Sequence, residues 1–150
     1  MVPENFIEMI GPTASRICKV YNLPASVCIA QAALESGWGE AVIGQFNYWG
    51  RKWGGWGNYE VHRTQEWIIG AYVTVDASFQ SYDSLDQAVE DWCQLIRKEP
   101  AYAEAAAAWD ASFNLTDFVT ALAPVYATDP DYAQKVLSTI AANDLTVYDH

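Results

Sequence analysis

The sequence predicts an α+β fold, mainly α, in which helices surround one small β-hairpin lobe. Apolar residues recur at helical spacing near both ends of the chain, whereas residues 59–80 alternate between apolar and polar side chains, as strands do. No linker, internal repeat or charge block divides the 150 residues. A chain of this length is expected to form one domain, 1–150, whose core needs neither disulfides nor metals.

Residues 4–21 form the first predicted helix. Its apolar positions recur every three or four residues, at Phe6, Ile10, Ala14, Ile17 and Val20. The pair Gly11-Pro12 predicts a kink, or a break into two helices. A second helix is expected over 24–36, because its alanines favour helix, Pro24 suits a first turn and a pair of glycines follows.

Glu35 is the only acid in the stretch PASVCIAQAALESGWG, residues 24–39. A mostly apolar helix is largely buried, and burial disfavours the ionised form of a carboxyl group. The negative end of the helix dipole disfavours that form as well. A carboxyl group that stays protonated near pH 7 is what a general acid requires. The alternative is a buried glutamate that pairs with an Arg or Lys side chain.

A Gly- and Trp-rich segment over residues 38–59 is typical of neither helix nor strand. Its glycines permit tight backbone turns, and its large rings suit the lining of a groove. The rings expected along that groove are Trp38, Tyr48, Trp49, Trp53 and Trp56. The alternative is a loop that these rings attach to the core.

Two strands are expected over 59–68 and 71–80, with Gly70 near the turn between them. The alternation places Glu66 on the same face as His62 and Thr64. A pocket between a helical lobe and a hairpin is a natural place for Glu35 and Glu66 to face each other. A glycosidase needs at least two such carboxyl groups.

After the hairpin the pattern returns to helix. Asp83 or Ser84 is suited to cap the next helix, and Asp131 is suited to precede the last one. The helices expected in this half of the chain span 84–96, 100–109, 115–122 and 131–142.

Composition narrows the classes of function. Aromatic residues make up 14% of the chain, with seven Trp and nine Tyr, which exceeds what the core requires and suggests stacking on a flat ligand such as a sugar or a base. The net charge of −11 argues against nucleic acid and against anionic membrane surfaces. No apolar run approaches the roughly 20 residues that cross a membrane, so no membrane insertion is expected.

The cysteines and histidines exclude several kinds of site. Cys18, Cys28 and Cys93 form no CxxC pair, and an odd count favours reduced, buried thiols. Cys28 lies seven residues before Glu35, but a cysteine nucleophile requires a histidine partner, and the chain has only His62 and His150. The same scarcity argues against a zinc hydrolase or a Ser-His-Asp triad, and no glycine-rich phosphate loop is visible. No metal or cofactor is expected.

Five segments together resemble the glucosaminidase domain of glycoside hydrolase family 73. The run SVCIAQAALESGWG (26–39) and the NYWGRK that follows (47–52) resemble the AQAALESGWG and Asn-aromatic-Gly-Lys segments of that family. Three further segments match in order: TQEW (64–67), FQSYDSLDQAVEDW (79–92) and YATDPDYAQKV (126–136). The resemblance spans roughly residues 4 to 142, and the family groups flagellar-rod peptidoglycan hydrolases, autolysins and phage lysis enzymes.

The resemblance implies a lysozyme-like fold and hydrolysis of the β-1,4 bond after N-acetylglucosamine in peptidoglycan. It implies that Glu35 is the general acid and that Glu66 is the second acid, on a mobile hairpin. It also implies a tyrosine close to Glu35, for which we expect Tyr132, with Tyr126 as the alternative. A phenol there suits a hydrogen bond to the carboxyl group or to the substrate acetamido group, whereas the alternative is a core tyrosine.

Two departures from the family pattern concern substrate contacts. Gln80 stands where the family commonly has an arginine. Asn47 matches the family asparagine but has a different neighbour, Tyr48. These changes leave the expected chemistry intact and bear on which glycan is preferred.

Competing functions and settings follow from the same resemblance. The alternatives are a muramidase or lytic transglycosylase on the same fold, and a catalytically silent glycan-binding domain. The N-terminus MVPENFIEMIG carries acids rather than a basic segment, so no signal peptide is expected. We expect action in the cell wall or periplasm of a target cell, as a phage endolysin or as an injected antibacterial toxin whose producer holds an immunity protein.

Overall fold

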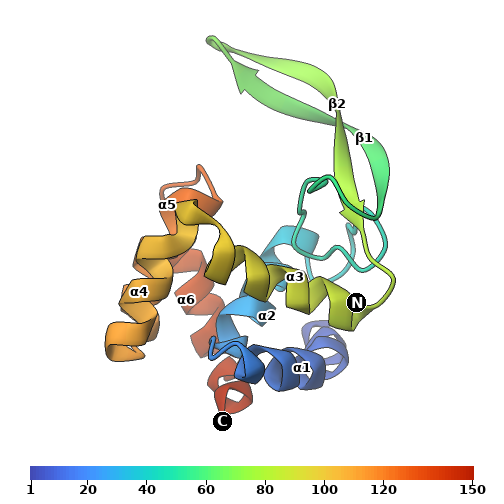
Figure 1. Ribbon diagram of the computed structural model, residues 1–150. Helices are drawn as coiled ribbons and strands as arrows, with labels where there is room; N and C mark the ends of the chain where they lie inside the picture. Colours follow the sequence, from blue (N-terminus) through green and yellow to red (C-terminus); the bar gives the residue numbers. More distant parts are fainter.

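Six α-helices pack together and one antiparallel hairpin projects from them in a computed structural model that describes residues 1–150 (Figure 1). The helices are α1 (Pro3–Val20), α2 (Ala25–Ser36), α3 (Leu85–Lys98), α4 (Ala103–Ser112), α5 (Leu115–Tyr126) and α6 (Tyr132–Ala142). Two short 3₁₀ helices, η1 (Pro100–Tyr102) and η2 (Leu145–Asp149), precede α4 and end the chain. No helix is long and apolar enough to cross a bilayer.

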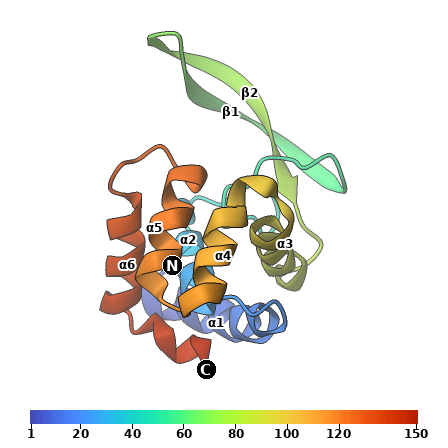
Figure 2. The same ribbon diagram turned by 60° about the vertical axis from the view of Figure 1, so that its left-hand side comes forward.

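Helix α2 forms the centre of the core. It contacts α1, α6 and η2, and ten of its residues are buried. The views in Figures 1 and 2 show it enclosed by the other helices. It begins after Pro24 and ends at Gly37, whose φ of 57° is the left-handed conformation that favours glycine at a helix end. The predicted second helix is therefore confirmed, with Pro24 as the residue before its first turn.

Helix α1 runs through Pro12 as one helix, so the predicted alternative of a break into two helices does not occur. Gly11 is buried there because the ring of Tyr148 lies against it, at 2.4 Å from where a Cβ atom would stand. Val20, expected on the apolar face, is 80% exposed because the helix ends at that residue.

The later helices follow the predicted order. Ser84 caps α3 by accepting a hydrogen bond from Gln87 N at 3.1 Å, as its sequence position predicts. The segment expected over 100–109 divides into η1 and α4, and α5 continues four residues beyond the predicted 122. Helix α6 begins after Asp131 as expected.

The hairpin is a two-stranded sheet of β1 (Asn58–Ile68) and β2 (Ala71–Ser81), paired from Asn58 with Ser81 to Ile68 with Ala71. Its two turn residues, Ile69 and Gly70, both have positive φ, as a two-residue turn with the right-handed strand twist requires. Only the base of the hairpin is buried, at Phe79 and Gln80.

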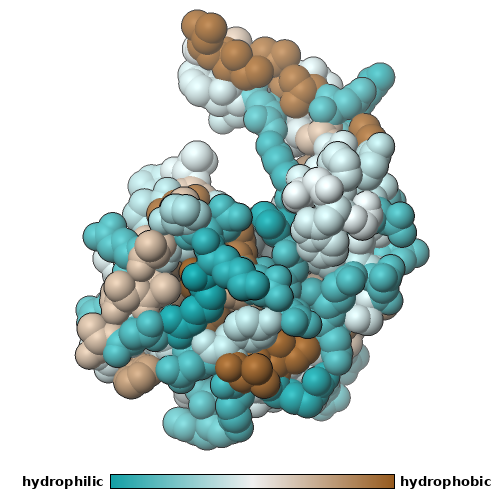
Figure 3. Space-filling model, in the orientation of Figure 1, coloured by the Kyte–Doolittle hydropathy of each residue, from teal (hydrophilic) through white to brown (hydrophobic).

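An open hollow separates the hairpin from the helical body (Figure 3). Exposed apolar residues gather at the far end of the hairpin, and they are Trp67, Ile68, Ile69, Tyr72 and Val73. The connecting segment from α2 to β1 lies at the base of the hairpin, where Lys52 pairs with Phe79 of β2 as an isolated bridge. The hairpin is thus attached to the body only at its base.

The three cysteines are free and buried, as their spacing predicts. Cys18 of α1 and Cys93 of α3 lie in contact, with their sulfur atoms 3.7 Å apart. Burial raises the pKa of all three thiols, which disfavours the reactive thiolate form.

Candidate active site

Glu35 lies in the last turn of α2, where the buried helix reaches the surface. Its side chain lines two adjoining cavities. The Trp49 pocket, about 220 Å³, is lined by Glu35, Trp49, Gly50, Arg51, Lys52, Leu95, Tyr102 and Tyr126. The Lys135 pocket, about 340 Å³, is lined by Leu34, Glu35, Ala127, Thr128, Asp129, Tyr132 and Lys135. Glu35 is therefore the side chain that both cavities share.

The helix around Glu35 is buried, but the Glu35 side chain itself is exposed at the helix end. The expectation of a buried glutamate was wrong for this reason. Even so, desolvation by the surrounding protein raises the pKa of Glu35, and hydrogen bonding from Tyr132 lowers it to a smaller extent. No Arg or Lys forms an ion pair with it. The alternative of a charge-paired glutamate is therefore absent.

Tyr132 and Tyr126 stand together beside Glu35. Their rings are stacked, with centroids 5.8 Å apart and planes at 6°. The Tyr126 hydroxyl donates to the backbone oxygen of Trp49 at 3.1 Å, so its proton is occupied. Burial raises the pKa of Tyr132, as does the negative charge of nearby Glu35. Of the two tyrosines, Tyr132 is the one whose hydroxyl lowers the pKa of the Glu35 carboxyl.

Glu66 lies near the far end of β1 and lines neither of the two pockets. Its carboxylate accepts from Lys52 Nζ at 2.5 Å, which is its single polar contact with another side chain. Lys52 in turn lines the Trp49 pocket together with Glu35. The two candidate acids are thus connected through Lys52 and do not touch each other.

Only one of the five rings expected along the groove lines a pocket that contains Glu35. Trp49 lines the pocket that bears its name, and its indole donates to Cys28 O at 2.9 Å. Trp38 and Tyr48 pack edge-on against Phe6. Trp53 and Trp56 are partly exposed on the loop beside the hairpin base, where Trp53 Nε1 donates to Trp56 O at 2.9 Å. Only Trp49 and Tyr126 among the predicted rings line the Trp49 pocket.

Asn47 is buried and entirely occupied by backbone groups. Its amide nitrogen donates to Arg51 O at 2.8 Å and to Gln80 O at 2.9 Å, and its oxygen accepts from Arg51 N at 2.9 Å. The side chain of Gln80 likewise bonds backbone groups, at Gly54 N and Trp56 O. Asn47 thus holds the loop that carries Arg51 and Lys52 against β2, and it offers no free polar atom to a substrate.

Sequence reasoning missed the two cations of the Trp49 pocket. Arg51 lines it while its Nε donates to Asp91 Oδ2 at 2.8 Å, and the same oxygen accepts from the Tyr82 hydroxyl at 2.5 Å. Lys52 follows directly. The signal that was available is the adjacent Arg-Lys pair, which is one quarter of the eight Lys and Arg of a strongly acidic chain.

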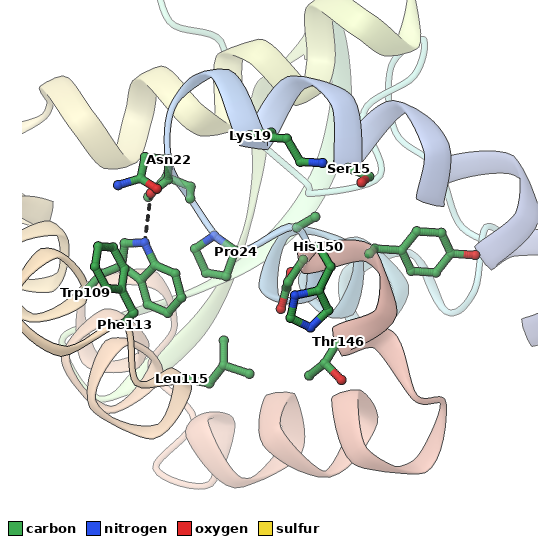
Figure 4. Close-up of a pocket in the computed structure, with 13 residues that line it drawn as sticks. Ser15, Lys19, Asn22, Pro24, Trp109, Phe113, Leu115, Thr146 and His150 are labelled. Carbon is green, nitrogen blue, oxygen red and sulfur yellow. Dashed lines mark hydrogen bonds between the residues drawn. The ribbon is translucent and has the colours of Figure 1, made fainter.

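The largest cavity lies elsewhere and does not contain Glu35. It measures about 460 Å³ and is lined by residues of α1, the α1–α2 turn, the α4–α5 region and the C-terminal segment (Figure 4). Trp109 stands at its wall and donates its indole N–H to Asn22 O at 2.8 Å. Its lining includes Asp149, whose pKa burial also raises, but the two oxygens of Asp149 accept hydrogen bonds from Ser26 N at 2.8 Å and from Ser26 Oγ at 2.7 Å. Because that carboxyl group is held by the protein itself, the Glu35 pockets are the better candidate for the active site.

Comparison with known proteins decides the family. A family model described as mannosyl-glycoprotein endo-beta-N-acetylglucosaminidase, that of the glucosaminidase family, matches residues 11–145. The chain belongs to the glucosaminidase family. The resemblance to glycoside hydrolase family 73 is thereby confirmed.

Relatives of the glucosaminidase domain carry two kinds of name. The chain is 35% identical to a probable N-acetylmuramidase of Lactococcus lactis subsp. cremoris, over 97% of this chain and 35% of that protein. It is 32% identical to the exo-glucosaminidase LytG of Bacillus subtilis, over 96% of this chain and 52% of that protein. The chain therefore spans about a third to a half of the length of these relatives.

The fold of the glucosaminidase domain is shared with a solved structure. The catalytic domain of the autolysin Auto from Listeria monocytogenes superposes with a TM-score of 0.88 at 33% identity, over 98% of this chain and 87% of that one. The predicted α+β, mainly helical fold with a small β-hairpin is confirmed.

Proposed function

We propose that this domain hydrolyses the β-1,4 bond after N-acetylglucosamine in peptidoglycan, with Glu35 as the general acid. The observation that carries the proposal is the state of Glu35. It is a carboxyl group without an ion pair, its pKa is raised by desolvation, and it is shared by two adjoining cavities. A carboxylic acid that keeps its proton near neutral pH protonates the departing glycosidic oxygen.

The charge that develops at the anomeric carbon needs a second group. We propose Glu66, water held by Glu66, or the N-acetyl oxygen of the substrate itself for that role. Glu66 reaches the Trp49 pocket only through Lys52. Tyr132 supports the acid from the opposite side, by a hydrogen bond to the Glu35 carboxyl or to the substrate acetamido group.

Glycan contacts are proposed for the residues that line the two pockets. Trp49, Tyr102 and Tyr126 offer rings on one side of Glu35, and Lys135 and Thr128 offer polar groups on the other. The exposed rings of Trp53 and Trp56 are proposed as outlying stacking positions for a longer glycan strand, since both are partly exposed.

The test is the digestion of purified peptidoglycan by the wild type and by Glu35→Gln. The variant is expected to fold, to bind the glycan and to show no turnover. Glu40→Gln serves as the matched control, because Glu40 is an exposed glutamate in the turn that follows α2. Substantial lysis by Glu35→Gln would remove Glu35 from the role of the acid.

A second candidate is cleavage of the other glycosidic bond, since the Lactococcus lactis relative is named a probable N-acetylmuramidase. Mass spectrometry of the released muropeptides separates the possibilities. A new reducing N-acetylglucosamine supports the glucosaminidase, a new reducing N-acetylmuramic acid supports a muramidase, and an anhydro sugar supports a lytic transglycosylase. A zymogram without a cleared band at any pH supports a silent glycan-binding domain.

We propose that the site of action is the cell wall or periplasm of a target cell. A phage endolysin and an injected toxin both place the domain there, and an immunity protein that fills the Glu35 cavities belongs to the second setting only. Expression with and without export to the periplasm of a bacterial host tests the location, because lysis is expected only upon export.

A further inference from the structure

One polar side chain lies in the middle of the apolar helix α2. Gln31 is 0% exposed, yet both ends of its amide are hydrogen-bonded. Its Oε1 accepts from Trp92 Nε1 of α3 at 2.7 Å, and its Nε2 donates to the Tyr132 hydroxyl of α6 at 3.2 Å. A buried amide between an indole and a phenol is costly unless each bond is made, so its retention in the core calls for a reason.

The chemistry of the three groups fixes the direction of this chain of hydrogen bonds. An indole N–H only donates, so the amide oxygen of Gln31 must face Trp92 and the amide nitrogen must face Tyr132. The Tyr132 oxygen therefore accepts a hydrogen bond from Gln31. A phenol has a single proton, and that proton is left for an acceptor on another side.

The surroundings of Tyr132 identify that acceptor. Tyr126 of α5 stacks on its ring but directs its own proton to Trp49 O. Lys135 of α6 is paired with Asp129 at 2.5 Å. Tyr102 of η1 is a further phenol nearby, and its oxygen is a weaker hydrogen-bond acceptor than a carboxylate oxygen.

Glu35 lies four residues after Gln31, on the same side of α2, and is the carboxyl group that faces Tyr132. Arg51 and Lys52 line the far side of the Trp49 pocket that Glu35 shares. They are occupied by Asp91 and Glu66, so neither neutralises Glu35.

We propose that Gln31 and Trp92 are positioning residues that make Tyr132 a hydrogen-bond donor to the Glu35 carboxyl. The inference rests on the proposed role of Glu35 as the acid. Once Glu35 has given its proton to the leaving oxygen, the Tyr132 proton meets the carboxylate that forms. The hydrogen bond thus strengthens as the reaction proceeds, which is the kind of contact that accelerates a step.

The test removes the indole donor by Trp92→Phe. The Gln31 amide is then free to turn its oxygen toward Tyr132 and to accept the phenol proton. The expected results are a rise in the apparent pKa of Glu35, seen as a shift of the basic limb of the kcat/KM profile to higher pH, and a loss in kcat of about tenfold or more. Gln31→Met, which deletes the amide, is expected to shift the limb in the same direction.

Two controls separate positioning from loss of structure. Trp109→Phe removes another buried indole donor, which bonds a backbone oxygen in the distant cavity, and it is expected to leave the pH profile unchanged. Tyr132→Phe is expected to shift the limb by itself, and Trp92→Phe is then expected to add nothing to it. Titration of the Glu35 carboxyl by NMR reports the same shift without any turnover.

An unchanged Glu35 titration in both Trp92→Phe and Gln31→Met would overturn the proposal. Additive effects of Trp92→Phe and Tyr132→Phe would overturn it as well. Neither outcome touches the proposed role of Glu35 as the acid, which fails if Glu35→Gln keeps its activity.

Discussion

Replacing Asp91 by Asn is expected to destabilise the protein far more than replacing Asp86 by Asn. Both aspartates lie on α3, and both pair with an arginine at 2.8 Å, Asp91 with Arg51 and Asp86 with Arg16. They differ in burial. The Asp91 and Arg51 side chains are 9% and 26% exposed, whereas those of Asp86 and Arg16 are 55% and 61% exposed.

The difference in burial sets the expected magnitudes. Loss of the Asp91 charge leaves the Arg51 guanidinium without a counter-ion in a mostly buried place, and breaking such a pair costs about 3–5 kcal/mol. The lower end, about 3 kcal/mol, is expected, because Arg51 keeps some contact with water and Asn retains an acceptor for the Tyr82 hydroxyl. The exposed Asp86 pair is expected to contribute about 0–1 kcal/mol.

Urea unfolding of the wild type and both variants measures the two free energies of unfolding, at one pH and with m-values compared. A loss of about 3 kcal/mol leaves a typical domain folded, so the measurement is practicable. Equal losses for the two variants would refute the argument that burial decides the strength of the pair. Because Arg51 lines the Trp49 pocket, Asp91→Asn is also expected to impair turnover, whereas Asp86→Asn is not.

Three further predictions follow from other contacts. Lys52→Met is expected to lower kcat roughly tenfold to a hundredfold because it releases Glu66, whereas Lys52→Arg is expected to keep most of the kcat. In a Glu66→Gln background, Lys52→Met is expected to cause no further loss of kcat, which steady-state kinetics measure. Because the pKa of Glu35 is raised above its ordinary 4.5, the stability from this group is present below pH 4.5 and lost as the pH rises through the folded-state pKa. In urea unfolding, the free energy of unfolding of Glu35→Gln minus that of the wild type is therefore expected to be larger at pH 7 than at pH 4. An equal difference at both pH values would contradict the raised pKa. Gly11→Ala is expected to lower stability by about 1–3 kcal/mol by overpacking against Tyr148, and the second change Tyr148→Ala is expected to remove the Gly11→Ala penalty.

Local patterns were sufficient to predict the α-helices and strands of the fold, but not the short 3₁₀ helices η1 and η2. Apolar spacing predicted α1, α2, α3 and α6, and alternation predicted both strands of the hairpin within a residue or so. These patterns succeed because each element buries one face, and the spacing of the apolar residues on that face is visible within the element's own sequence. The close contact of Gly11 was not predictable, for the opposite reason. Its role depends on Tyr148, which is far away in the sequence and is brought to α1 only by the packing of η2.

The candidate site was predictable only in part. Glu35 was identified because it is a single charge in an apolar helix, which is a local signal. The contacts of Gln31 with Trp92 and Tyr132 join three helices, so no local pattern indicates them. Lys52 and Glu66 are 14 residues apart in the sequence, so their contact is not indicated by a local pattern either. Trp38 and Tyr48 pack on Phe6, since a large ring beside a core gains more from burial there than from solvent exposure.

Titration of the Glu35 carboxyl by carbon-13 NMR measures directly whether this group holds its proton as a general acid must. Comparison of the wild type with Glu35→Gln assigns the signal. The wild type is expected to show an apparent pKa of Glu35 above the ordinary 4.5 of a glutamate, so that the proton is held toward the pH at which the enzyme works. An apparent pKa at or below 4.5 would mean that the group is an ordinary carboxylate, and the mechanism built on its proton would not stand.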